Sequence, residues 1–214
     1  MNNKISLSYL ILIIAPLFFG CRGPIKEENK NNASASSLTL VQKYIIDIKA
    51  SVVTWKGSML LESAEESIGY VYISKGELMI EKGQLVGGTV EIDMNTIEYK
   101  DKTNKNTPVK HLKSPDFFDV EKFPISTITI TKVASVSGKT IKITGNLTIK
   151  GISHPISFPA KVEVNAGIVK ANAKLIIDRT NWDVRYNSGK FYDNLADKTI
   201  SDSIEFDITI VAKK

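Results

Sequence analysis

The feature of this sequence that most restricts its fold is an alternation of apolar and polar residues that recurs along the chain. Between 140 and 150, apolar residues take odd positions and polar residues take even ones. Successive side chains of a β-strand point to opposite faces, so a period of two indicates a strand with one buried and one wet face. The same pattern recurs at 156–164, 169–177 and 204–210, and in shorter form at 90–94 and 128–130.

Further strands are expected from Tyr44 to Trp55, and one or two more between Gly69 and Ile80. Glycine supplies the positive backbone angles of tight turns, and four glycine-containing stretches separate the runs: Lys75-Gly76, Lys82-Gly83, Ser137-Gly138 and Asn165-Ala166-Gly167. No helical period of ten or more residues interrupts them. We therefore predict an antiparallel all-β domain of about eight strands. The alternation alone leaves a sandwich and a barrel open, although closure would remove exposed strand edges.

The first twenty residues resemble an export signal. They carry one charge, Lys4, and an apolar run, Leu10 to Phe19, that is shorter than the roughly 20 residues of a membrane-spanning helix. Cys21 follows Gly20, as in a bacterial lipoprotein signal, and its sulfur would then receive a diacylglycerol. The alternative is an ordinary signal peptide with an incidental cysteine. Cys21 is the only cysteine of the chain, so no disulfide can form within it.

The chain accordingly divides into three parts: a signal peptide at 1–20, the lipidated cysteine with a flexible tether at 21–37, and one folded domain at 38–214. Residues 22–37 contain one large apolar side chain, Ile25, so the tether cannot bury enough surface to offset its ordering entropy. We expect an exported protein that is lipid-anchored in the bacterial cell envelope, at the periplasmic face or in the outer membrane.

Composition argues against several classes of function. The sequence has three arginines and dispersed lysines, with no basic motif interleaved with aromatics, so nothing indicates nucleic-acid binding. The two histidines, His111 and His154, have no metal-ligand spacing, so we expect no metal site and no cofactor. No G-x-S-x-G nucleophile motif occurs. The domain is therefore expected to be non-catalytic.

Two segments depart from the strand pattern. Phe117 and Phe118 lie between Pro115 and Pro124, which predicts a short helical segment near 109–118 and a corner that plugs or lines one end of the fold. The other segment is Arg179 to Trp182, directly after the apolar run 169–177.

Several stretches together resemble the YceI-like family of lipocalin-like, polyisoprenoid-binding proteins. They are LVGGTVEIDMNTI at 85–97, HLKSPDFFDVEKFP at 111–124, GNLTIKGISHPISFPAKV at 145–162, IDRTNWDVRY at 177–186 and DNLADKTISDSIEFDI at 193–208. The resemblance implies an eight-stranded antiparallel lipocalin-like barrel whose interior holds an isoprenoid chain, in some members that of a quinone. The chain departs from the family pattern at Ser67-Ile68, where many members have a histidine, and at Lys110, where a glycine usually precedes the histidine.

The function that the resemblance implies is non-catalytic binding, storage or transport of a polyisoprenoid lipid or isoprenoid quinone in the cell envelope, with membrane attachment through Cys21; homodimers occur in the family. The alternative is a surface-displayed structural or interaction domain with a filled core. Near the barrel mouth, His111 would bond a headgroup or cap the backbone, and Arg179 would meet a headgroup or pair with Asp178 or Asp183. The expected ligand-binding residues are Val90, Ile92, Met94, His111, Phe117, Phe118, Ile128, Ile130, Ile141, Ile143, Leu147, Phe158, Val162, Leu175, Ile177, Arg179, Trp182, Phe206 and Ile208.

Overall fold

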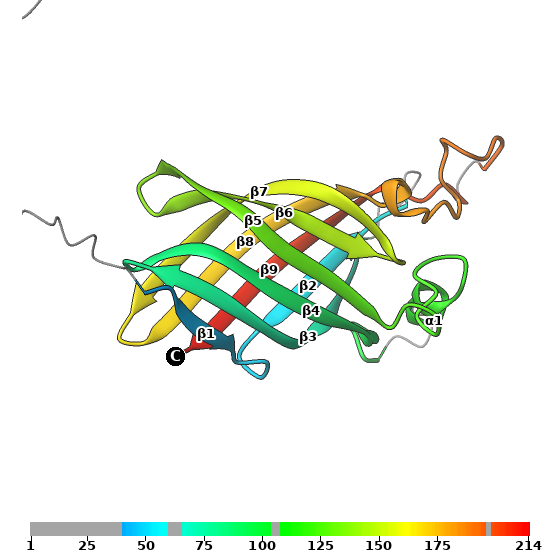
Figure 1. The fold of residues 1–214 in the computed structure, drawn as a ribbon. Helices are drawn as coiled ribbons and strands as arrows, with labels where there is room; N and C mark the ends of the chain where they lie inside the picture. The colour runs from blue at the N-terminus through cyan, green and yellow to red at the C-terminus, as the bar shows by residue number, and fades with distance from the viewer. Residues whose placement is uncertain (1–39, 60–65, 104–107, 196–197) are drawn as a thin grey trace, which may run out of the picture. The chain divides into compact units, whose positions relative to one another are not determined.

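A computed structural model describes residues 40–59, 66–103, 108–195 and 198–214. The expected signal peptide, the lipidated Cys21 and the tether lie outside these residues. The described chain is built mostly of strands (Figure 1). In chain order, the elements are β1 (Gln42–Ile46), β2 (Val52–Gly57), β3 (Ser67–Glu81), β4 (Gln84–Tyr99), α1 (Val109–Lys113), β5 (Ile125–Ser137), β6 (Thr140–Ile149), β7 (Ile152–Asn165), β8 (Ile168–Asp178), η1 (Arg179–Trp182) and β9 (Ser203–Lys213).

The strands form one antiparallel sheet that closes into a barrel. Its order is β3-β2-β9-β8-β7-β6-β5-β4, and β4 pairs back onto β3. β1 and β2 share one position between β3 and β9, because β1 pairs with residues 77–80 of β3 and β2 pairs with residues 67–71. The nine segments therefore make an eight-stranded barrel. This confirms the predicted fold, and the sandwich alternative is wrong.

The N-terminal part of the sheet differs from the sequence prediction. The expected strand from Tyr44 to Trp55 is interrupted at Asp47, whose carboxylate accepts hydrogen bonds from the N–H groups of Lys49 and Ala50 and so stabilises a turn. The one or two strands expected between Gly69 and Ile80 are a single strand, β3, that continues to Glu81.

Most of the turn predictions are confirmed. Lys82-Gly83 and Ala166-Gly167 each have two positive φ angles, as tight hairpin turns require, and the β5–β6 hairpin turns at Gly138. Lys75-Gly76 is not a turn. Gly76 lies inside β3 beside a β-bulge, where an added Cβ would come within 2.6 Å of Ile46 Cδ1. The glycine there permits close approach of β1 rather than a reversal of the chain.

One end of the barrel is covered by two irregular segments. The first is α1 with the turns that follow it to residue 123, which confirms the short helix predicted near 109–118. The second comprises the described residues from η1 to 195 and from 198 to 202. Figure 1 shows both segments at the same end, opposite the C-terminus. We call this end the α1 end.

The barrel wall is split between β7 and β8 near the α1 end. Their pairing covers residues 160–165 of β7 and 168–173 of β8, so within the described residues the first half of β7 lacks a partner on this side. Pro155 and Pro159 lie in that half. Proline has no N–H to leave unpaired, so it suits such an edge. Trp182 of η1 lies beside this split and is 2% exposed, and its Nε1 donates to the carbonyl of Leu147 at 3.1 Å.

Candidate functional site

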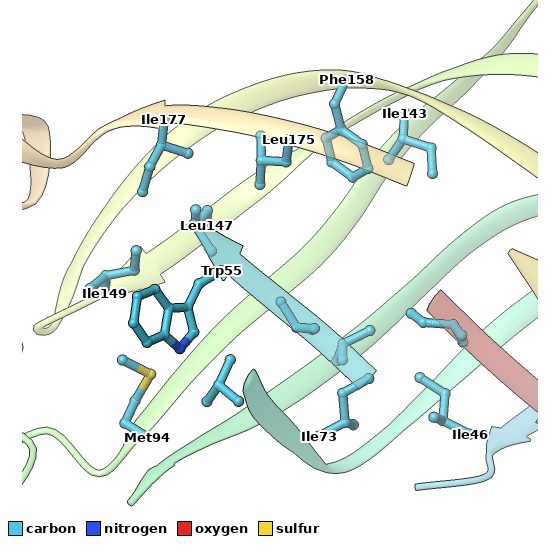
Figure 2. Packing of buried hydrophobic residues seen from close by; sticks show 14 of the residues in the cluster. Ile46, Trp55, Ile73, Met94, Ile143, Leu147, Ile149, Phe158, Leu175 and Ile177 are labelled. Atoms are coloured by element: carbon cyan, nitrogen blue, oxygen red, sulfur yellow. The ribbon is translucent and has the colours of Figure 1, made fainter. Parts of the chain in front are cut away.

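The inward side chains do not fill the barrel. They enclose a cavity of about 300 Å³ that is lined by residues of β2 to β9, α1 and η1. Ala160, Ala171 and Ala173 lie side by side on β7 and β8, and their small size leaves part of this space. Figure 2 shows larger lining residues, among them Met94, Ile143 and Leu175, reaching inward from different strands. The cavity is therefore a product of the alternation of inward and outward residues around the closed sheet.

Most of the residues expected to bind a ligand line this cavity. They are Val90, Ile92, Met94, His111, Phe117, Phe118, Ile128, Ile130, Ile143, Leu147, Phe158, Leu175, Arg179, Phe206 and Ile208.

The remaining four expected residues are not among the residues that line the cavity. Ile141 and Val162 lie next to its lining, because they pair with Ala160 and Ala171. Ile177 and Trp182 are buried beside the β7–β8 split. Trp182 is held there by its hydrogen bond to Leu147 and by its ring contact with His154, whose centroid is 5.3 Å away.

Several lining residues were missed, many of them on β2, β3 and β4. Alternation identifies Val53 with Trp55, and Val71 with Ile73, as inward pairs. The β3 bulge after Ile73 then moves the inward face from odd to even positions, so Leu78 also points inward. The missed residues on these three strands include Val53, Trp55, Val71, Ile73, Leu78, Leu85 and Ile97.

The few polar side chains of the lining gather toward the α1 end. Arg179 is the most buried of them, at 1% exposure. Its guanidinium donates to the carbonyls of Val184, Ile200 and Ser201 at 2.7–3.1 Å, and its Nη2 lies 3.3 Å from Asp202 Oδ1. Arg179 therefore fastens η1 to the segment that leads into β9.

The ion pair of Arg179 differs from the pairs expected from sequence. Its partner is Asp202, whereas Asp178 pairs with Lys190 and Asp183 pairs with Arg185. Burial lowers the pKa of Arg179, and the negative charges of Asp202 and Asp178 act in the opposite direction. The charge of Arg179 is thus compensated within the fold.

Aromatic stacking joins the two segments that cover the α1 end. The His111 ring lies 5.1 Å from the ring of Phe117 and 4.3 Å from that of Tyr186, and the guanidinium of Arg179 lies 5.5 Å from the Phe117 ring. The backbone carbonyl of His111 accepts hydrogen bonds from Ser114. The main-chain carbonyl of His111 thus caps the end of α1. The imidazole of His111 packs against the two aromatic rings and also borders the cavity.

Trp55 lines the cavity from β2, and its ring position is fixed by Gly69 on β3. A Cβ at Gly69 would lie 2.3 Å from the indole Cζ2 and 2.1 Å from the carbonyl oxygen of Glu98. The indole therefore lies against bare backbone, with the Tyr99 ring 6.3 Å away. Trp55 is 7% exposed, and Figure 2 shows it among Met94, Leu147 and Ile149, which line the same cavity.

Two further observations concern the part of the chain that the structure describes. No three His, Cys, Asp or Glu side chains of these residues gather as a metal site would require. None of their helices is both long and apolar enough to cross a bilayer.

Comparison with known proteins places this barrel and its cavity in a family. Residues 44–212 match the YceI-like domain. Over 73 residues, the chain is 40% identical to Protein YceI of Salmonella arizonae and of Salmonella newport; the match covers 34% of this chain and 36% of each relative, so it spans about a third of their length.

Solved structures share the fold at low identity. BcnA of Burkholderia cenocepacia has a TM-score of 0.62 at 20% identity, over 78% of this chain and 99% of that one. The YceI protein of Campylobacter jejuni has a TM-score of 0.51 at 23% identity, over 61% and 74%. A polyisoprenoid-binding domain from Saccharophagus degradans, implicated in plant cell wall breakdown, has a TM-score of 0.57 at 13% identity, over 79% and 97%.

Proposed function

We propose, since the chain belongs to the YceI-like domain family, that its barrel binds the prenyl chain of a polyisoprenoid lipid or isoprenoid quinone, and that it stores or carries this lipid without catalysing a reaction. The observation that carries the proposal is the apolar cavity of about 300 Å³ along the barrel interior. One structural relative is described as a polyisoprenoid-binding domain, which supports the choice of ligand class.

The energetics of an empty cavity favour occupancy. Dry cavity volume costs about 24 cal/mol per Å³, so 300 Å³ corresponds to roughly 7 kcal/mol, comparable with the total stability of a typical domain, about 5–15 kcal/mol. A bound apolar chain offsets this cost. The alternative of a filled structural core is disfavoured for the same reason, because the side chains leave space that a folded interior ordinarily fills.

The length of the ligand follows from the cost of association. Each buried CH₂ contributes about 0.8 kcal/mol, so a five-carbon prenyl unit contributes up to roughly 4 kcal/mol. Association and chain ordering cost about 4–15 kcal/mol. Several units must therefore be buried before binding is tight, and we expect a preference for long prenyl chains.

The place of this activity is also a proposal. The apolar segment before Cys21 would export the chain, and a diacylglycerol on Cys21 would hold the barrel close to a membrane of the cell envelope. Such an anchor would keep the cavity near the bilayer in which prenyl lipids reside.

A thermal unfolding titration of the delipidated full-length chain tests the function. We expect farnesol and geranylgeraniol to raise the melting temperature in that order, because the longer chain buries more CH₂ groups. A ligand at about 100 times its Kd adds about 2.7 kcal/mol to the free energy of unfolding. Octadecanol, a straight-chain alcohol, is the control for unspecific apolar binding. If no prenol raises the melting temperature more than octadecanol does, the proposal is contradicted.

A further inference from the structure

Two buried nitrogen atoms border the cavity without a hydrogen-bond partner. Among the described residues, Trp55 Nε1 and His111 Nε2 are both buried and unpaired, and both residues line the cavity. The third such atom, Asp202 Oδ1, instead faces the guanidinium of Arg179. Buried polar groups of native proteins are nearly always paired, so unpaired ones at a binding cavity indicate where a ligand supplies the partner.

The chemistry of Trp55 restricts that partner. The indole N–H can only donate, so the ligand atom that meets it must be an acceptor. The indole packs against Gly69, where an added Cβ would lie 2.3 Å from Cζ2 and 2.4 Å from Cε2, so the ring has little room to change its orientation. The unpaired imidazole nitrogen of His111 can donate or accept, according to its tautomer, so it is compatible with a carbonyl or a hydroxyl.

The described residues that line the cavity offer no free cation to an anionic ligand group. No lysine occurs among the described lining residues, and Arg179 already donates to three carbonyls and pairs with Asp202. The nearby Lys56 pairs with Glu205 and Asp207. A diphosphate in this cavity would be a buried charge without a free cation, which is strongly unfavourable.

We propose that the α1 end of the cavity is a headgroup site for a neutral, oxygen-bearing group, a carbonyl or hydroxyl that accepts a hydrogen bond from Trp55 Nε1, and that the prenyl tail runs from there toward Leu85 and Ile210. His111 borders the same site. This inference rests on the proposed function and adds its selectivity: neutral prenyl lipids bind, and phosphorylated ones are rejected.

The test compares three ligands of one chain length on the delipidated full-length chain: geranylgeraniol, the corresponding hydrocarbon without the hydroxyl, and geranylgeranyl diphosphate. We expect geranylgeraniol to bind most tightly and the diphosphate most weakly. Trp55→Phe should weaken the binding of geranylgeraniol about five- to tenfold more than it weakens the binding of the hydrocarbon. This difference is the size of one net hydrogen bond. His111→Phe retains a ring against Phe117 and Tyr186. The change in geranylgeraniol affinity in this variant measures the contribution of His111 Nε2.

Trp182→Phe is the matched control, because the Nε1 of Trp182 is already paired with Leu147 outside the cavity. This variant should leave the preference for the alcohol over the hydrocarbon unchanged. If Trp55→Phe weakens both ligands equally, or if the diphosphate binds as tightly as the alcohol, the headgroup inference is overturned while the lipid function stands. If neither the alcohol nor the hydrocarbon binds the unmodified chain, the lipid function itself fails.

Discussion

Replacing Arg179 by leucine should lower the free energy of unfolding by about 3–5 kcal/mol, the usual cost of breaking a buried ion pair. The guanidinium is 1% exposed and satisfies the carbonyls of Val184, Ile200 and Ser201. Leucine would leave these acceptors and the carboxylate of Asp202 without their donor, and the Phe117 ring without its cation. Urea unfolding of the wild-type and variant chains measures the difference.

Arg185→Leu is the matched control on the same segment. Arg185 pairs with Asp183 at 2.7 Å, but both side chains are more than half exposed, and exposed pairs contribute about 0–1 kcal/mol. A loss below about 1 kcal/mol for Arg179→Leu as well would show that the α1 end does not depend on this arginine.

Ile143→Trp should abolish most prenyl binding while the barrel still folds. Ile143 lines the cavity from β6 (Figure 2), so the larger ring would occupy space that the ligand needs. Displacing one five-carbon unit removes up to roughly 4 kcal/mol of binding free energy. Loss of about half of this amount, about 2 kcal/mol, raises the Kd for geranylgeraniol about thirtyfold, which is the size of effect that we expect. The unliganded variant should unfold within about 1 kcal/mol of wild type, because the added volume enters a cavity. A filled core would instead lose about 1–3 kcal/mol.

Ile141→Trp provides the comparison for this experiment. Ile141 lies two residues earlier on the same face of β6 and pairs with Ala160 at the margin of the cavity, but it is not itself among the lining residues, so its replacement should weaken geranylgeraniol binding much less than Ile143→Trp does. Equal loss of binding in both variants would contradict the placement of the ligand in this cavity.

The strands were predictable from sequence because alternation is a local property. Residues 140–150 show the inward face of β6 directly, and the buried Ile143, Leu147 and Ile149 follow it. Closure of the sheet was not readable from the period, since it depends on the pairing of the first strands, β1 and β2, with the last strand, β9. The inward face of β3 was lost at its bulge after Ile73, where one extra residue reverses the phase.

The two tryptophans show why the site was harder to predict than the fold. Trp182 was among the expected ligand-binding residues and Trp55 was not, but the structure places Trp55 at the cavity and Trp182 beside the β7–β8 split. The difference arises from a glycine on another strand that makes room for the Trp55 ring, and from the split between β7 and β8 that accommodates Trp182. Likewise, the partner of Arg179 lies 23 residues along the chain at Asp202 rather than beside it.

The most direct test of the account is the lipid content of the full-length chain purified from bacterial membranes in which it is expressed. Solvent extraction and mass spectrometry should find a neutral prenyl lipid in an amount comparable with the protein, and the Ile143→Trp variant, purified in parallel, should carry much less. A wild-type protein that carries no prenyl lipid, or only the phospholipids of the surrounding membrane at the level found in the variant, would contradict the claim that this barrel is built to hold one.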